Sequence, residues 1–259
     1  MMRSPEAAGG DFRGCSSRKR PPGLRILPQR LGAARGAETA STREPLLLLA
    51  LLAGALVVSG ISPRDRLTWL LEEAPIFVGI PVLIATFRDF RLTRLTYRLI
   101  FVHAVLLTIG GHYTFSAVPA GIWLRDALGL ARNHFDRVVH LVGGFVPAIF
   151  AREVLLRKTG LRPGRWLFLV VTLSSLGGGA LYEILEWWAA KLAGMDASEF
   201  LAIQGDVWDT QWDLFLDLCG AVLGQLLIAR RQDRELGELL DRWPILGLGP
   251  MDAAGARAH

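Results

Sequence analysis

Long apolar runs separated by short polar connections are the feature that most constrains the fold of this sequence. Each run is close to the length that crosses a hydrocarbon core of roughly 30 Å. The runs are Pro45–Ile61, Ala74–Phe87, Leu99–Phe115, Val138–Leu156, Trp166–Trp188 and Leu214–Ala229. Because 51% of the 259 residues are hydrophobic and the mean hydropathy is positive, a soluble domain is disfavoured. The sequence predicts an all-α polytopic membrane helix bundle of about six transmembrane helices.

The second apolar run departs from this pattern. Ala74–Phe87 is short, contains Pro75 and Pro81, and directly follows Glu72 and Glu73. Proline is tolerated in a membrane span when neighbouring groups satisfy the backbone carbonyls that it frees. We therefore expect either a short span or a buried or broken helix at this position.

Basic residues collect in alternate connections between the runs. Arginine and lysine are frequent before residue 45, in the second and fourth connections and after the last run, and they are scarcer in the other connections. The positive-inside rule then predicts that both termini are cytoplasmic and that the first, third and fifth connections face outward. This distribution also explains the net charge of +5, so no nucleic-acid partner is expected. The predicted location is a bacterial cytoplasmic (inner) membrane, with the lipid bilayer as partner.

The chain is predicted to have three parts. Residues 1–44 are rich in Arg, Ala, Gly, Ser and Pro, which is typical of a disordered basic tail. Residues 45–230 form the transmembrane domain, and residues 231–259 form a cytoplasmic C-terminal tail. An uncleaved first span is favoured over a signal peptide, with an over-extended gene start as the alternative. Cys15 and Cys219 fall in different phases of the membrane, so no disulfide framework is expected.

Four polar motifs fall at the predicted outer ends of the later runs. They are GGHYTFSAVP (110–119), RNHFDRVVH (132–140), YEILEWW (182–188) and QGDVWDTQWD (204–213). Side chains three or four residues apart share a helix face. Stripes of this kind are formed by Asp136 and His140, by Glu183 and Glu186, and by Asp206, Asp209, Asp213 and Asp217. Below the acids, Gly143, Gly144, Gly220 and Gly224 predict close helix packing.

These motifs predict an outward-facing polar pocket with an acidic wall. An ionised carboxylate that faces lipid costs several kcal/mol, so a carboxylate in a span must face the bundle, be paired or be protonated. The cost is largest for Asp217, which lies about one turn deeper than Asp213. The candidate pocket residues are His112, Arg132, Asn133, Asp136, Arg137, His140, Glu183, Glu186, Gln204, Asp206, Asp209, Gln211, Asp213 and Asp217.

Three functional interpretations of the pocket stay open. The first is a binding or transport site for a polar lipid or cell-envelope intermediate. The second is a metal-assisted hydrolase of envelope lipids, with a divalent metal as the one cofactor considered, although no HExxH or paired CxxC motif is present. The candidate metal ligands are Asp136, His140, Glu183, Asp209 and Asp213. The third is a structural lattice in which arginines neutralise the acids. His103 is expected to be a core histidine apart from this group; catalytic residues and oligomeric state are not assigned.

The same motifs carry a family resemblance. HYTFSAVP, RNHFDRVVH, YEILEWW and QGDVWDTQWDLFLDLCGAVLG resemble the YjdF-type family of predicted bacterial inner-membrane proteins, over Leu46 to about Ala229. A looser similarity to VanZ-like membrane proteins rests on DRVVHLVGGF, YEILEWW and DLFLDLCGAVLG. In this sequence Trp187 follows Glu186 where a glutamine is usual, and Asp217 replaces a typical asparagine. The resemblance implies a membrane architecture and no particular activity.

Overall fold

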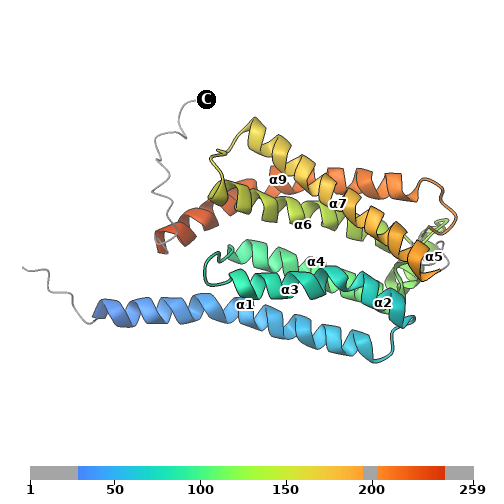
Figure 1. Cartoon of the computed structure of the whole chain (residues 1–259), viewed down its shortest axis with the longest axis horizontal. Coiled ribbons are helices and arrows are strands. Elements are labelled where there is room, and N and C mark those ends of the chain that lie inside the picture. Colours follow the sequence, from blue (N-terminus) through green and yellow to red (C-terminus); the bar gives the residue numbers. More distant parts are fainter. Residues whose placement is uncertain (1–28, 195–202, 243–259) are drawn as a thin grey trace, which may run out of the picture. The chain divides into compact units, whose positions relative to one another are not determined.

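The computed structural model describes residues 29–194 and 203–242, and all regular elements in these two ranges are helical. They are α1 (Gln29–Ile61), α2 (Arg66–Glu72), α3 (Ala74–Thr86), α4 (Arg94–Tyr113), the 3₁₀ helix η1 (Phe115–Ala117), α5 (Pro119–Leu128), α6 (Phe135–Lys158), α7 (Arg165–Ala193) and α9 (Asp209–Arg242) (Figure 1). The all-α prediction is confirmed. The chain divides into two compact units, residues 1–41 and 42–259, and the features discussed below lie in the second unit.

Five of these helices are long and apolar enough to cross a membrane. They are α1 from Thr42 onward, α4, α6, α7 and α9. Helices α2 and α3 meet the same criteria only as a pair, which is bent by 41°. Pro75 lies in the first turn of α3, where its missing N–H costs no helical hydrogen bond. This region therefore has the broken helix that was one of the predicted alternatives, and the domain has up to six spans when the bent pair is counted as one.

Side-chain caps fix where two of the helices begin. Asp65 accepts a hydrogen bond from the Thr68 backbone N–H at 2.7 Å and so caps α2. This hydrogen bond lowers the pKa of Asp65. Thr93 caps α4 by accepting from the Thr96 N–H at 3.3 Å. These caps stabilise the two helix starts that follow the first and second connections.

Two helices extend beyond the boundaries predicted for the transmembrane domain. Helix α1 begins at Gln29, inside the segment 1–44 that was predicted as a tail. Helix α9 continues from the last apolar run to Arg242, through residues 231–242 that were predicted as tail. An ion pair one turn apart on this extension, Arg231 Nε to Glu235 Oε1 at 3.3 Å, supports the helix. The other predicted tail segments, 1–28 and 243–259, lie outside the described residues.

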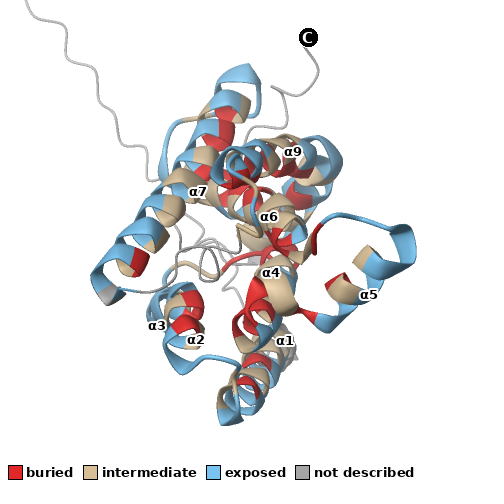
Figure 2. Cartoon of the chain, turned by 90° about the vertical axis from the view of Figure 1, so that its right-hand side faces the viewer, coloured by how far each residue is buried: buried red, intermediate tan, exposed pale blue. Residues whose placement is uncertain are grey.

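Helix α6 is the central helix of the membrane domain and packs against α4, α7 and α9 (Figure 2). Its approach to α9 is close because glycines face the partner backbone. A Cβ atom on Gly144 would overlap the backbone carbonyl of Asp217, and one on Gly220 would overlap the carbonyl of Leu141. The predicted close packing below the acidic residues is confirmed at these positions.

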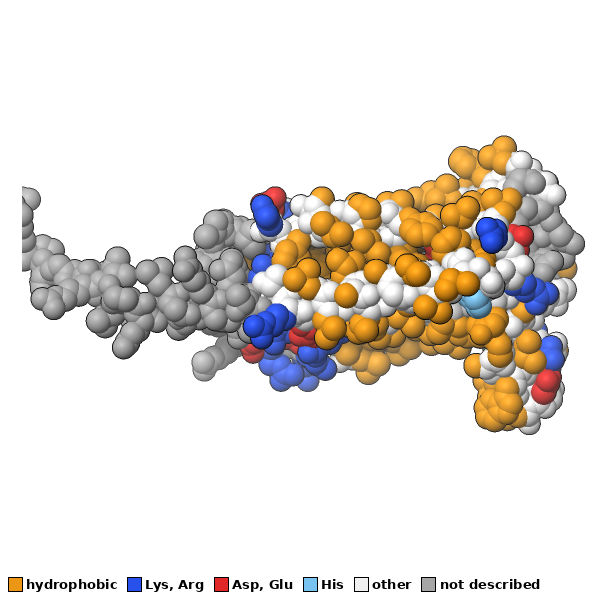
Figure 3. All heavy atoms as spheres, turned by 90° about the horizontal axis from the view of Figure 1, so that it is seen from below, with side chains coloured by type: hydrophobic (Ala, Val, Ile, Leu, Met, Phe, Trp, Pro, Cys, Tyr) orange, Lys and Arg blue, Asp and Glu red, His pale blue; other side chains and the backbone are white. Residues whose placement is uncertain are grey.

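Apolar side chains form both the interior and the outer surface of the domain. Two buried clusters consist of Leu52, Ile76, Ala104, Leu107, Phe115 and Val139, and of Ala148, Leu167, Val171 and Ala221. Many other large apolar side chains are exposed, and Figure 3 shows them covering the middle of one face with Lys and Arg toward its ends. An exposed apolar belt of this kind is expected where helices face lipid.

We predict that Gly220→Leu separates α6 from α9, because even a Cβ at this position overlaps the Leu141 carbonyl. Overpacking a well-packed site costs about 1–3 kcal/mol, occasionally more. Thermal unfolding of the purified protein in detergent, followed by circular dichroism, should show a lower midpoint. The matched control is Gly177→Leu in α7, where a Cβ meets no atom within 4 Å. Equal losses in the two variants would contradict the close approach.

The predicted orientation can be tested by labelling single cysteines in a chain whose native cysteines are replaced by serine. Asp126 in α5 and Arg162 between α6 and α7 are both exposed. A maleimide that cannot cross the membrane should modify the Asp126→Cys variant in intact cells, and the Arg162→Cys variant only after lysis. The reverse pattern would show that the positive-inside assignment is wrong.

Candidate functional site

A cavity of about 280 Å³ opens among α2, α3, α4, α6, α7 and α9, toward the end of the domain that carries α5. Its titratable lining residues are Glu72, His103, Asp136, His140, Tyr182, Glu183, Glu186, Asp213 and Asp217. No lysine or arginine is among the described residues that line it. Buried charges in proteins are normally paired, so six carboxylates facing one space in which histidine is the only basic side chain among the described lining residues are unusual. We call this space the acidic cavity.

Helical spacing and small residues bring the acids together. Three helices each contribute a pair about one turn apart: Asp136 and His140 on α6, Glu183 and Glu186 on α7, and Asp213 and Asp217 on α9. The Asp217 carboxylate fits between α6 and α7 only because both helices have glycine there. A Cβ on Gly179 would overlap this carboxylate, and one on Gly143 would lie 3.3 Å from Asp217 Oδ1.

The imidazole of His140 lies at the centre of the acidic cavity. Distances from its Nε2 are 3.5 Å to Glu183 Oε1, 3.8 Å to Asp136 Oδ1 and 4.0 Å to Asp213 Oδ1. Its other nitrogen, Nδ1, faces Asp217 Oδ2 at 3.6 Å. One ring nitrogen thus faces a single carboxylate and the other faces three. Metal-ligating histidines have this arrangement, in which a carboxylate behind the ring sets its tautomer and orientation.

Two carboxylates leave an oxygen without a hydrogen-bond partner in the cavity wall. These atoms are Asp213 Oδ1 and Asp217 Oδ2, on residues that are only 3% and 2% exposed. Leaving a buried acceptor unsatisfied costs about 1–3 kcal/mol, and more when it is charged. Ligand atoms of Asp136, His140 and Asp213 all lie within 4.8 Å of one another, close enough to share one metal ion. The unsatisfied oxygens therefore mark a place suited to a cation.

The α2 side of the cavity carries a second acidic pair. Tyr182 on α7 donates a hydrogen bond to Glu72 Oε2 on α2 at 3.3 Å, and Glu186 lines the same cavity one turn along α7 from Tyr182. Glu72 is not among the site residues predicted from the sequence, because its position depends on the bend between α2 and α3. Its one signal in the sequence is that Glu72 and Glu73 directly precede the proline-containing run 74–87.

Arginines and aspartates form a separate layer next to the cavity. Arg132 forms an ion pair with Asp209 and lies 3.5 Å from Asp206, whereas Arg137 Nη2 donates to Asp206 Oδ2 at 2.5 Å. The Trp208 N–H, which donates to Asp206 Oδ1 at 3.0 Å, lowers the pKa of Asp206, and Arg137 adds to this effect. Because this pKa is depressed, the contribution of Asp206 to stability is present at neutral pH and is lost as the pH falls.

The remaining contacts of this layer join two connections. The Asn133 N–H donates to Gln204 Oε1, and Gln204 Nε2 donates to the Asn133 carbonyl, both at 2.9 Å. Asn133 Nδ2 also donates to the carbonyls of Ser116 and Val118 at 3.1 Å. We call the six residues of this layer, Arg132, Asn133, Arg137, Gln204, Asp206 and Asp209, the polar lattice.

The structure thus divides the predicted pocket residues. Asp136, His140, Glu183, Glu186, Asp213 and Asp217 line the acidic cavity, and six others form the polar lattice. Asp209, predicted as a metal ligand, instead pairs with Arg132. Two predicted residues belong to neither group: His112 Nδ1 lies 2.7 Å from the Ser59 carbonyl, and Gln211 is exposed.

His103 was expected to lie apart from this group, and that expectation is wrong. Its side chain lines the acidic cavity, with Nε2 3.7 Å from the position that a Cβ on Gly143 would take. The position of His103 on the inner half of the third apolar run suggested a core histidine. Because Gly143 has no side chain, the imidazole is instead open to the cavity.

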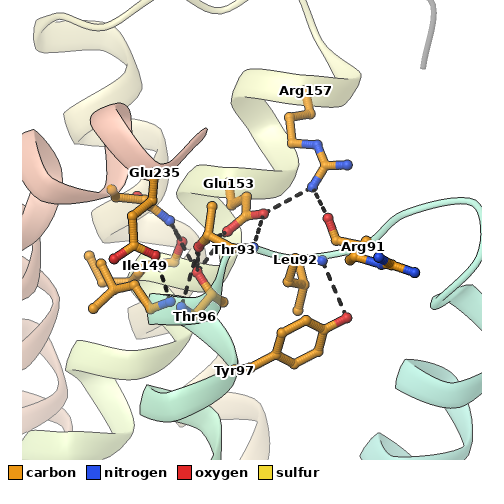
Figure 4. Close-up of polar contacts among 11 residues, drawn as sticks. Arg91, Leu92, Thr93, Thr96, Tyr97, Ile149, Glu153, Arg157 and Glu235 are labelled. Carbon is orange, nitrogen blue, oxygen red and sulfur yellow. Dashed lines mark hydrogen bonds and ion pairs between the residues drawn. The ribbon is translucent and has the colours of Figure 1, made fainter. Parts of the chain in front are cut away.

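A second buried cluster, at the opposite end of the domain, shows how this fold satisfies a carboxylate. Glu153 is fully buried and accepts hydrogen bonds from the Thr93 N–H (2.9 Å), Thr93 Oγ1 (2.8 Å), Thr96 Oγ1 (2.7 Å) and Arg157 Nη1 (2.9 Å) (Figure 4). Both carboxylate oxygens have partners, in contrast to Asp213 and Asp217. The sequence did not predict this cluster, because its arginine had been assigned only to the positive-inside pattern.

Comparison with known proteins agrees with the membrane architecture. The family model described as "Predicted membrane protein (DUF2238)" matches residues 44–234. The "Inner membrane protein YjdF" of Escherichia coli (strain K12) is 44% identical over 181 residues, which cover 70% of this chain and 87% of that protein. No solved structure matches. The predicted family resemblance and the inner-membrane, multi-pass localisation are confirmed, and the matched region contains the whole acidic cavity.

We predict opposite effects of removing one charge from each buried cluster in metal-free protein. Glu153→Gln should destabilise the fold by roughly 3–5 kcal/mol, because it breaks a satisfied ion pair with Arg157. Asp213→Asn should leave stability unchanged or raise it, because it removes one of the four carboxylates that crowd around the single imidazole of His140. Thermal unfolding in detergent with EDTA measures both. Equal destabilisation would mean that the acidic cavity is a structural lattice.

Proposed function

This chain belongs to the DUF2238 family of membrane proteins, and we propose that it binds a divalent metal ion in the acidic cavity at the outward-facing end of the bundle. The ligands in this proposal are Asp136, His140 and Asp213, with Glu183 as a fourth. Asp217 is the residue that orients the imidazole from behind. Mixed carboxylate and imidazole sets suit Mn²⁺ and Zn²⁺ among the common divalent ions.

The observation that carries this proposal is the surroundings of His140. Its Nε2 faces three carboxylate oxygens within 4.0 Å, and one of them, Asp213 Oδ1, has no hydrogen-bond partner. A divalent ion among these atoms gives each oxygen a partner and lowers the cost of burying like charges together. The polar lattice supports the same conclusion, because its arginines pair with Asp206 and Asp209 and none of them lines the cavity, where the acids face only histidine as a basic side chain among the described residues.

Metal-assisted hydrolysis of an envelope lipid is the second candidate function. It is favoured by the presence of Glu72, Tyr182 and Glu186 in the same cavity but outside the proposed ligand set. A carboxylate beside a metal-bound water can act as the general base that removes its proton. Turnover by metal-loaded protein that is lost in Glu186→Gln, with metal affinity unchanged, would favour this candidate over binding alone.

Isothermal titration of EDTA-treated, detergent-purified protein with Mn²⁺ tests the proposal. We expect one ion per chain, with affinity reduced more than about 100-fold in Asp213→Asn and about 10–100-fold in Asp217→Asn, as for residues that ligate a metal and residues that orient a ligand. Asp206→Asn in the polar lattice is the matched control and should bind like the wild type. Absence of binding by the wild type, or equal losses in Asp213→Asn and Asp206→Asn, would contradict the proposal.

A further inference from the structure

A second, apolar cavity of about 460 Å³ lies between α1, α3 and α4. Its wall is almost entirely aliphatic and aromatic and includes Leu49, Leu52, Gly79, Ile80 and Phe101. This volume lies within the range of roughly 300–1,000 Å³ that is typical of pockets for small molecules. We call this space the apolar groove.

The apolar groove and the acidic cavity are neighbours inside the domain. Both are lined by Pro75, His103 and Leu107. An apolar space therefore lies directly beside one lined by six carboxylates, and a single molecule that occupies both must be amphiphilic. His103 lies at this junction, where a polar head group and an apolar chain would meet.

Two sets of polar contacts on α1 flank the groove. Before the groove, Glu44 forms an ion pair with Arg98 and lies 3.7 Å from Arg94. Beyond it, Ser59 Oγ donates to the Thr108 carbonyl at 3.3 Å and accepts from Trp69 Nε1 at 2.8 Å. Between these contacts the groove remains open, because a Cβ added to Gly79 would meet no atom within 4 Å.

The acidic lining of the cavity determines which kind of polar head group an amphiphilic ligand can have. Six carboxylates and no lysine or arginine are among the described residues that line the acidic cavity, so its lining disfavours an anionic head group and favours a cationic one. Glu72 and Glu186 line the same cavity, and their carboxylate oxygens lie outside the proposed metal ligands and the contact between His140 and Asp217. A protonated amine offers three hydrogen-bond donors to such oxygens.

We infer that the protein binds an amine-headed membrane lipid, with its amine in the acidic cavity and an acyl chain in the apolar groove. This inference rests on the proposed metal site for the ion that shares the cavity, and it names the class of molecule bound beside that ion. Binding energy in the groove comes from burial of the chain against α1, α3 and α4, and selectivity comes from the carboxylates.

The test uses phosphatidylethanolamine with a diazirine in its acyl chain, in phosphatidylglycerol nanodiscs that contain the Mn²⁺-loaded protein. A phosphatidylglycerol probe with the same chain is the comparison. After irradiation, mass spectrometry should find groove peptides of α1 and α3 labelled several-fold more by the ethanolamine probe. Gly79→Leu, which fills the groove, should reduce this labelling to the level of the phosphatidylglycerol probe.

Gly54→Leu is the matched control, because Gly54 on α1 is exposed, has no atom within 4 Å of an added Cβ and does not line the groove. It should label like the wild type. Equal labelling by the ethanolamine and glycerol probes, or equal labelling of Gly79→Leu and Gly54→Leu, would overturn the inference. Either result would mean that the labelled peptides only contact ordinary bilayer lipid at the protein surface. Mn²⁺ titration of Gly79→Leu separates the lipid proposal from the metal proposal. This variant should bind Mn²⁺ with the affinity of the wild type. If the metal proposal is wrong, the wild type itself does not bind Mn²⁺.

Discussion

The close approach of α6 and α9 is the contact on which the acidic cavity depends. Gly144 and Gly220 allow the two backbones to touch, and this brings the α9 aspartates against His140 on α6. Gly179 on α7 then leaves room for the Asp217 carboxylate between the helices. The glycines therefore have two effects at once: they supply the packing that holds helices together in lipid, and they set the spacing of the cavity acids.

Buried carboxylates have different partners at the two ends of the domain. At one end, Glu153 is satisfied by two threonines and Arg157, and this cluster ties the start of α4 to α6. At the other end, arginines are present but pair with Asp206 and Asp209 in the polar lattice. No lysine or arginine is among the described residues that line the acidic cavity, and buried oxygens of Asp213 and Asp217 have no hydrogen-bond partner. Buried polar groups left without partners are typical of a functional site, where a fold gives up stability.

Much of this arrangement could be predicted from the sequence. Apolar run length predicted the spans, and helical spacing predicted which acids share a face, so the pairs Asp136 with His140 and Asp213 with Asp217 were found before the structure. The sequence could not separate Asp209 from Asp213, since both lie on one stripe and only the position of Arg132 decides which is neutralised. Glu72 and His103 were missed because a bent helix and a missing side chain on Gly143 bring them to the cavity.

Pulsed electron paramagnetic resonance of the Mn²⁺-loaded protein shows whether His140 Nε2 and the surrounding carboxylates hold a metal ion, because it detects the nuclei bonded to the ion. We expect coupling to one imidazole nitrogen in the wild type, and we expect this coupling to disappear in His140→Gln. Mn²⁺ bound without any nitrogen coupling, or a coupling that persists in His140→Gln, would contradict this expectation.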